Sequence, residues 1–466
     1  MSDVENIELS NRYQRQPTQQ SFINDTNSTA LSSAISVEPL EGGENPEDYP
    51  DGGLMAYSVI LGSFLGLVVN LGIINSVGAI QTYVSNHQLS HLKQSSISWI
   101  FSIYLSLSYA GGLIVGPIFD KKGPLMILIT STGFIFMGLM AIANSVEIWQ
   151  FILSFIALGI GNGFGMTPLI GVISHWFLKK RGNTTGIATS GGSVGGLIFP
   201  LMLRSLYPKV GFVWSIRILA FICLFCQVSS LLLVKERMIS KHNQEQNNAT
   251  SEEIAVEKKR FYVSWDMFKI KDYKFFFLAL GGFCAELSLI LLVTYYASYA
   301  IAHGTTESTS YLLLTLWNGT GIAGRWVPAY VSDYYGRFNV NIIMLLSYCL
   351  SIFVLLYPFA SNQKILWAFA GIGGFCSGSI LSLLPACLSQ ITPVKQIGTK
   401  YGILNFILST ANLFGIPIAA AIIDDGSSKQ YNNFMVLVGC LSIGGVLFWA
   451  ISRCIVLKSF KLLVKV

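Results

Sequence analysis

Charged residues are scarce in this sequence. Only 12% of the 466 residues are charged, while 52% are hydrophobic, whereas soluble domains carry about 25% charged residues. A soluble fold of this length could not bury so much apolar surface, but lipid solvates the apolar surface of a membrane protein. The composition therefore excludes an ordinary soluble domain and predicts an all-α membrane protein.

Signatures of enzymes and of metal or cofactor sites are also missing. The sequence has no HExxH, and its five histidines are scattered. Cys223 and Cys226 form a CxxC inside an apolar run, which favours two packed residues over a metal or redox site. Three glycine-rich runs lack the strand and spacing of a nucleotide-binding loop: 159–165, 191–196 and 371–378. We therefore expect no enzymatic activity, no cofactor, no metal and no nucleotide-powered pump.

The first 50 residues lack the basic start and apolar run of a signal peptide. They hold nine acids and two bases, a composition typical of a disordered tail. The remaining bases lie at the ends of apolar runs, which favours anionic lipid headgroups over nucleic acid as their partner. The expected partners are the lipid bilayer and a small-molecule solute, and the oligomeric state is left open.

Long apolar runs are what the sequence has in abundance. Twelve of them have about 20 residues or more, enough for a helix to cross about 30 Å of hydrocarbon: 54–80, 95–118, 124–143, 147–173, 183–204, 211–234, 273–301, 307–331, 339–360, 364–388, 399–422 and 432–455. We therefore predict an acidic tail, an N-terminal six-helix half, a cytosolic linker, a C-terminal six-helix half and a cytosolic tail: 1–50, 51–234, 235–272, 273–457 and 458–466.

Lysine and arginine are unequally divided between the two sets of connecting loops. One set is rich in bases, for example Lys179, Lys180 and Arg181, while the other holds Lys93, Lys209, Lys364 and Lys429, with Arg204 near a helix end. Basic loops stay on the cytosolic side. The base-rich loops and both termini are therefore predicted to be cytosolic.

An internal repeat divides the chain into two related halves. Similar residues recur at nearly equal distances of 213, 212 and 216 residues: Asp120 and Asp333, Gly159 and Gly371, and Gly182 and Gly398. Repeated halves of this kind rock against each other around a central solute site. The pattern predicts twelve transmembrane helices arranged as two six-helix pseudo-repeats.

The loop after the second apolar run has the sequence GPIFDKKG, from Gly116 to Gly123. It resembles the signature loop of the major facilitator superfamily, which implies that fold and a role in closing the cytosolic gate. The alternative is an ordinary charged turn. The expected gating residues are those of this loop and of its repeat: Gly116, Asp120, Lys121, Gly123, Asp333, Gly336 and Arg337.

Two further motifs resemble those of the monocarboxylate-porter family. The first precedes the first apolar run and the second precedes the fifth: Asp51, Gly52 and Gly53, then Phe177, Lys179, Lys180, Arg181, Gly186, Ala188 and Gly191. The runs GIINSVGAIQTYV, SISWIFSIYLS and GGFCAELS resemble the fungal branch that contains riboflavin transporters. These resemblances imply a shared fold and a shared central site.

Two departures separate the sequence from the proton-coupled lactate carriers of that family. Those carriers place a lysine in the first span, but here no lysine lies between Asp51 and Lys93. They also place an aspartate four residues before the arginine of span eight, where this chain has Gly321 before Arg325. We expect a secondary transporter for facilitated uptake of riboflavin or a similar planar solute. The alternatives are a proton-coupled monocarboxylate transporter, a non-transporting membrane sensor and a membrane enzyme.

Polar and aromatic side chains inside the apolar runs are the candidate solute ligands, because buried charge is costly in a membrane. Arg325 either binds a carbonyl-bearing solute or pairs with Asp333 at the cytosolic end. Glu286 either serves solute or proton, or partners a neighbouring helix. The other candidates are Asn75 and three aromatics that either stack on a ring or pack in the core: Trp317, Tyr295 and Tyr296. The plasma membrane is the expected location, and the vacuolar membrane is the alternative.

Overall fold

The computed structural model describes residues 49–92, 94–237, 272–423 and 427–457. Most of the predicted acidic tail, residues 238–271 of the predicted linker and the predicted tail 458–466 lie outside the described residues. In the described part of the chain every regular element is a helix, and none is a strand. The prediction of an all-α protein is confirmed.

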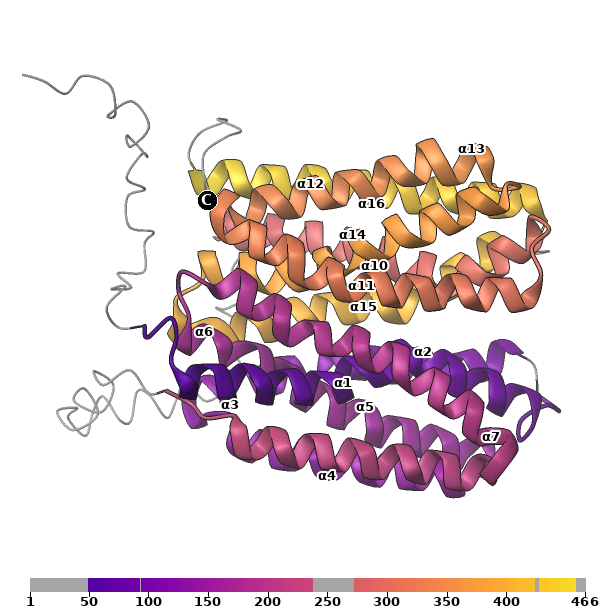
Figure 1. The fold of residues 1–466 in the computed structure, drawn as a ribbon, viewed down its shortest axis with the longest axis horizontal. Helices are drawn as coiled ribbons and strands as arrows, with labels where there is room; N and C mark the ends of the chain where they lie inside the picture. Colours follow the sequence, from indigo (N-terminus) through magenta and orange to yellow (C-terminus); the bar gives the residue numbers. More distant parts are fainter. Residues whose placement is uncertain (1–48, 93, 238–271, 424–426, 458–466) are drawn as a thin grey trace, which may run out of the picture. The chain divides into compact units, whose positions relative to one another are not determined.

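The first half of the chain forms helices within residues 54–233, drawn from indigo to magenta in Figure 1. They are α1 (Leu54–Asn86), α2 (Gln94–Ala110), α3 (Gly112–Lys122), α4 (Leu125–Asn144), α5 (Ile148–Gly171), α6 (Ile173–Trp176) and α7 (Arg181–Leu233). The pairs α2–α3 and α5–α6 each make one apolar span. Together these helices contain the N-terminal part of the twelve-helix fold.

The second half forms helices within residues 273–457, drawn from salmon pink through orange to yellow. They are α10 (Tyr273–Ala302), α11 (Glu307–Tyr335), α12 (Arg337–Leu350), α13 (Tyr357–Phe359), α14 (Gln363–Ile391), α15 (Ile397–Ile423) and α16 (Ser428–Leu457). A π-helical turn, Ser351–Leu356, joins α12 to α13. Asp272, Thr306 and Asn362 each accept a backbone N–H of the following turn, so polar caps mark where α10, α11 and α14 begin.

Ten helices among the described residues are long and apolar enough to cross a membrane, and two details reconcile them with twelve crossings. Helix α7 has 53 residues and kinks at Gly211, whose φ is +75°, so it supplies two crossings. The predicted break between 204 and 211 is instead continuous helix up to this kink. Helix α11 has 29 residues but is not among the ten apolar helices. Its polar residues include Asn318, Thr320 and Arg325, whose side chains lie close to glycines of α7 or α14.

Each half packs mainly on itself (Figure 1): α1 on α7 and α4 on α5 in one half, α11 on α14 and α10 on α16 in the other. The halves meet along two principal contacts. Helix α15 packs on α2 and α3, and helix α11 packs on α7. We call these the α3–α15 interface and the α7–α11 interface.

The repeat extends to details that the three sequence matches did not include. Gly123 and Gly336 end their helices with φ of +75° and +95°, a conformation that favours glycine, and they are 213 residues apart. His87 follows α1 and His303 follows α10. The Nδ1 of each histidine lies within 3.0 Å of the carbonyl oxygen of the tyrosine four residues earlier. Matching helix ends support the division into two related halves.

Candidate functional site

The α3–α15 interface joins the halves at the predicted cytosolic end. The Asp120 carboxylate accepts the backbone N–H of Gly398 at 2.8 Å and that of Thr399 at 2.7 Å, and also the Thr399 hydroxyl at 2.6 Å. These N–H groups begin α15, where the helix leaves its first donors unpaired and its dipole favours an anion. A Cβ on Gly116 would lie 2.2 Å from the Gly398 carbonyl oxygen, so only glycine permits this approach.

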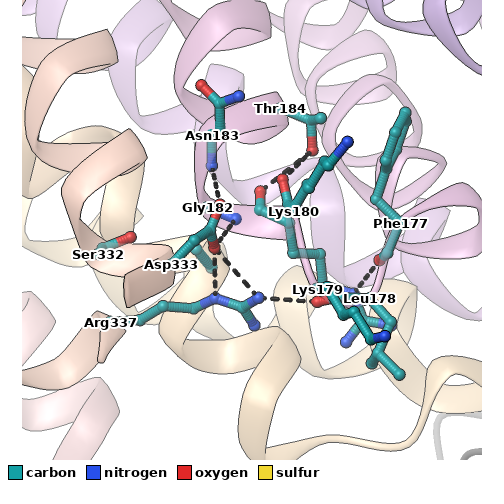
Figure 2. Close-up of polar contacts among 12 residues, drawn as sticks. Phe177, Leu178, Lys179, Lys180, Gly182, Asn183, Thr184, Ser332, Asp333 and Arg337 are labelled. Carbon is teal, nitrogen blue, oxygen red and sulfur yellow. Dashed lines mark hydrogen bonds and ion pairs between the residues drawn. The ribbon is translucent and has the colours of Figure 1, made fainter. Parts of the chain in front are cut away.

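The α7–α11 interface repeats this arrangement (Figure 2). The Asp333 carboxylate accepts the N–H of Gly182 at 2.9 Å and that of Asn183 at 2.8 Å, which begin α7. A Cβ on Gly186 would lie 2.5 Å from the Ala329 Cβ. The two predicted gating aspartates therefore occupy equivalent positions, each on the start of a helix in the other half.

Arg337 adds a cation to the second interface. Its guanidinium lies 3.4 Å from the Asp333 carboxylate and donates to the Leu178 carbonyl at 2.9 Å (Figure 2). Gly336 turns the chain between these two side chains. Lys121 lies in the last turn of α3, beside Asp120.

The two motifs of the monocarboxylate-porter type meet in the structure. The Asp51 carboxylate accepts backbone N–H groups of Leu178 at 2.9 Å and Lys179 at 3.0 Å. Asp51 has φ +45°, and Gly53 precedes α1 with φ +95°, while Gly52 lies between them. The residues before the first span therefore hold the loop from which α7 begins.

Arg181 is the most buried charged residue of this loop, at 1% exposed. Its guanidinium donates to the carbonyls of Phe177 and Ser174 in its own half and of Ser389 in the other half, at 2.7, 3.0 and 2.9 Å. Phe177 is buried against Tyr57 of α1. Arg181 therefore links the family motif to the contact between the halves.

Deeper in the protein, four polar side chains form what we call the central polar cluster: Tyr109, Glu286, Arg325 and Tyr401. None is more than 6% exposed. The Tyr109 hydroxyl donates to Glu286 Oε1 at 2.9 Å, and Arg325 interacts electrostatically with the other three. Counted along their helices, Tyr109 and Glu286 each lie 13 residues (122 − 109 and 286 − 273) from the predicted cytosolic end, about 20 Å at 1.5 Å per residue.

Arg325 also crosses between the halves. Its Nη1 donates to the Thr189 carbonyl of α7 at 3.0 Å, and its Nε is buried without a hydrogen-bond partner among the described residues. A buried unpaired donor costs about 1–3 kcal/mol. The guanidinium thus keeps an unused donor and interacts electrostatically with Glu286.

The other candidate solute ligands lie apart from this cluster or inside the core. Tyr296 and Trp317 are buried, with ring centroids 5.9 Å apart, and both pack on Phe369. Tyr295 is partly buried, and its hydroxyl donates to the Ile416 carbonyl at 3.2 Å. Asn75 is exposed and donates to the Gly192 carbonyl of α7. A role for any of them in solute binding stays a prediction.

Tyr109 and Tyr401 are absent from the sequence-based candidates. Each stands beside a glycine of the α3–α15 interface: Tyr109 precedes Gly112 by three residues, and Tyr401 directly precedes Gly402. A Cβ on Gly402 would lie 2.0 Å from the Gly112 carbonyl oxygen. A tyrosine within three residues of a glycine that packs closely on the other half is the signal that could have identified them. In the described segments no three His, Cys, Asp or Glu side chains gather as a metal site.

This arrangement can support alternating access. Carboxylates and glycines hold the halves together at one end, while a polar cluster lies between the halves about halfway along the helices. Breaking the contacts at the end would expose the cluster to that side. Solute sites of secondary transporters lie at such a depth between repeated halves.

Comparisons with known proteins agree with this architecture. The profile of the Major Facilitator Superfamily matches residues 55–347 and 278–456. The riboflavin transporter MCH5 of Saccharomyces cerevisiae is 39% identical over 423 residues, covering 89% of this chain and 81% of that protein. The MFS transporter asaE of Aspergillus flavus is 33% identical over 437 residues, covering 93% and 95%. The aspyridones efflux protein of Emericella nidulans is 30% identical over 420 residues, covering 88% and 80%.

Solved structures share the fold at low sequence identity. The transporter FucP in its outward conformation matches with a TM-score of 0.64 and 15% identity, covering 86% of this chain and 98% of that one. The proton:xylose symporter XylE matches with a TM-score of 0.63 and 15% identity, covering 84% and 94%. The chain is therefore an integral, multi-pass membrane transporter that belongs to the Major Facilitator Superfamily.

Proposed function

We propose that this protein mediates facilitated uptake of a neutral planar solute, with riboflavin as the first solute to test. The observation that carries the proposal is the similarity to the fungal riboflavin transporter over most of both chains. It is supported by the absence of the membrane lysine and aspartate of proton-coupled lactate carriers, noted at the first span and at Gly321.

The charges of the central polar cluster also favour a neutral solute. With Glu286 ionised, Arg325 contributes one positive charge and Glu286 one negative charge, and the two interact electrostatically. A neutral solute preserves this balance. An anionic solute adds a charge that the cluster does not neutralise, and an unpaired charge is costly in a buried site.

The test is an uptake panel in a cell that lacks its own carriers for the solutes. Labelled riboflavin and labelled lactate are supplied with and without a protonophore, and surface expression is measured in parallel. The expected result is saturable riboflavin uptake that the protonophore leaves unchanged. Lactate uptake that collapses with the protonophore, with riboflavin ignored, would replace the proposal with proton-coupled monocarboxylate transport.

The direction of transport needs its own measurement, because two relatives are named efflux proteins. Cells or vesicles preloaded with labelled riboflavin are compared with cells supplied from outside. Facilitated transport predicts movement down the concentration gradient in both experiments. Release without uptake would identify an exporter. A fluorescent fusion then distinguishes the proposed plasma membrane from the vacuolar membrane.

Orientation follows from the distribution of lysine and arginine and is tested separately. Lys179 precedes α7 and Lys364 lies in the first turn of α14, at the opposite end of the spans in the predicted topology. An impermeant thiol reagent should therefore reach Lys179→Cys and Lys364→Cys from opposite sides. The predicted cytosolic side is that of Lys179. Labelling of both positions from the same side would contradict the proposed topology.

A further inference from the structure

The bond between Tyr109 and Glu286 joins the two halves through side chains alone. Tyr109 lies on α2 and Glu286 on α10, and the hydroxyl donates to the carboxylate at 2.9 Å. The other deep contact, from Arg325 to Thr189, ends on a backbone carbonyl. An ionised carboxylate only accepts hydrogen bonds and a guanidinium only donates them, so a ligand with a donor can compete with Tyr109 for Glu286.

The hydrogen-bonding groups of the central polar cluster form a recognisable pattern. Arg325 has a buried Nε–H without a partner in the described part of the chain. Glu286 supplies an acceptor, and the Tyr401 hydroxyl interacts electrostatically with both. The cluster therefore offers a donor, an acceptor and a hydroxyl that can donate.

We propose that this cluster binds the imide edge of a flat heterocycle, in which an N–H stands between two carbonyl groups. The imide N–H donates to Glu286 in place of Tyr109, and the two carbonyls accept from Arg325 and Tyr401. This inference rests on the proposed function, because the isoalloxazine ring of riboflavin carries such an edge. It makes Glu286 the residue that recognises the solute donor.

Replacement of the Tyr109 hydroxyl by the solute N–H on Glu286, which we call the exchange, also links solute binding to the predicted gate. Helix α2 continues through Gly111 into α3, which carries Gly112, Gly116 and Asp120 at the contact with α15. When the solute replaces Tyr109 on Glu286, one bond between the halves is lost above this contact. A ligand shifts a conformational equilibrium by its difference in affinity for the two states, and the released bond supplies such a difference.

The first test compares riboflavin with an analogue methylated at the imide nitrogen. The wild-type protein should prefer riboflavin by about 10- to 150-fold in apparent affinity, because a hydrogen bond to a charged group is lost with the N–H. Glu286→Met keeps the length of the side chain but removes the acceptor, so both solutes should be transported with equal affinity. Unchanged discrimination in Glu286→Met would overturn the proposal.

The second test uses Tyr109→Phe, which removes only the competing hydroxyl. Riboflavin should bind more tightly, by about 10-fold or more, because no hydrogen bond to the charged carboxylate must be broken first. A purely structural role of Tyr109 predicts weaker binding instead, and that result would reject the exchange. Tyr104→Phe is the matched control, since its hydroxyl accepts from Asn162 within the same half. The affinity of the Tyr104→Phe variant for riboflavin should match that of the wild type.

The third test needs no solute to be transported. Ser389→Cys places a thiol at a buried position whose carbonyl bonds Arg181 of the other half. In membranes without solute, Tyr109→Phe should raise its reactivity from the predicted cytosolic side, while Tyr104→Phe should not. Raised reactivity of the thiol without any riboflavin transport would support a role of the Tyr109–Glu286 bond in the gate and would reject riboflavin as the solute. Unchanged reactivity together with normal riboflavin uptake would reject the link to the gate and leave the proposed function intact.

Discussion

The α3–α15 and α7–α11 interfaces use the same parts at the predicted cytosolic end. In each, an aspartate accepts the first backbone N–H groups of a helix in the other half, and a glycine one turn further along that helix allows close packing. The equivalent positions are 213 residues apart for the aspartates and 216 for the helix starts. The repeat has therefore preserved one set of contacts between the halves in two copies.

The interfaces differ in what surrounds each aspartate. Asp120 receives a hydroxyl from Thr399, whereas Asp333 interacts with the guanidinium of Arg337. At the position equivalent to Thr399 stands Asn183, whose side-chain oxygen accepts the Trp326 indole N–H. They also differ at depth, where Glu286 is held by a side chain and Arg325 by a backbone carbonyl.

The contacts between the halves are alike at the predicted cytosolic end and differ at the depth of the central polar cluster. The predicted gating contacts depend on backbone groups and glycines, which both copies of the repeat supply. In the central polar cluster both charged side chains, Glu286 and Arg325, come from the C-terminal half, and the N-terminal half supplies Tyr109. The halves can therefore stay alike at one end while they differ around the central polar cluster.

The largest effect is expected from blocking one interface. Gly402→Val places side-chain atoms where even a Cβ lies 2.0 Å from the Gly112 carbonyl oxygen. Backbone cannot yield as a flexible side chain does, and overpacking costs about 1–3 kcal/mol or more. Transport should fall to background at normal surface expression, and the Ser389→Cys thiol should become reactive. Gly133→Val is the control, because no atom lies within 4 Å of its Cβ position; equal loss in both variants would contradict this explanation.

Arg325→Ala tests the deep contact of the α7–α11 interface. It removes the bond to Thr189 and leaves Glu286 without its nearby cation. Apparent affinity for the transported solute should weaken by about 10- to 150-fold, corresponding to about 1.5–3 kcal/mol for a charged hydrogen bond. Arg325→Lys should recover little, since an ammonium does not reproduce the planar fork. Kinetics like those of the wild type for every solute would remove Arg325 from the site.

Asp120→Asn and Asp333→Asn compare the two copies directly. An amide has one oxygen where the carboxylate offers two, and it carries no charge for the helix start. Each variant should raise the Ser389→Cys reactivity about tenfold and lower the transport rate, because charged hydrogen bonds exceed neutral ones by about 1–1.5 kcal/mol. If the copies act independently, the two free energies should add in the double variant, and the reactivity of the Ser389→Cys thiol should rise about 100-fold. An effect of the double variant no larger than that of one single variant would show that one interface alone closes the gate.

The smallest effect is expected from the one hydroxyl that distinguishes the two aspartates. Thr399→Val keeps the shape of the side chain and both backbone bonds to Asp120, but it removes the bond from Oγ1. Loss of this hydrogen bond should cost about 0.5–1.5 kcal/mol. The reactivity of the Ser389→Cys thiol, which reports gate opening, should therefore rise about 2- to 12-fold. Asn183→Val at the equivalent position removes the bond to Trp326 rather than one to Asp333, so gate opening should stay unchanged. Equal effects at both positions would contradict the assigned difference.

Local sequence was sufficient to predict the spans and to match Asp120 with Asp333 as equivalent positions of the two halves. Apolar runs of the right length must be helices in lipid, because a helix satisfies its own backbone hydrogen bonds. Asp120 and Asp333 were found because each lies in a short loop that recurs in the second half. The continuous helix up to the kink at Gly211 was not predicted, because the continuation of a helix past an expected loop depends on its packing. The polar character of α11 was also not predicted.

The partners of the buried side chains were decided by tertiary structure alone. Glu286 and Tyr109 are 177 residues apart, and nothing in the spacing of either helix says which neighbour it will face. Trp317 and Tyr296 look alike in sequence as ring-binding candidates, yet they pack on Phe369 within one half. Helix periodicity assigns a residue to a face, whereas the pairing of faces depends on how separate helices cross. For this protein the spans follow from residues in sequence order, and the central polar cluster exists only where the two halves meet.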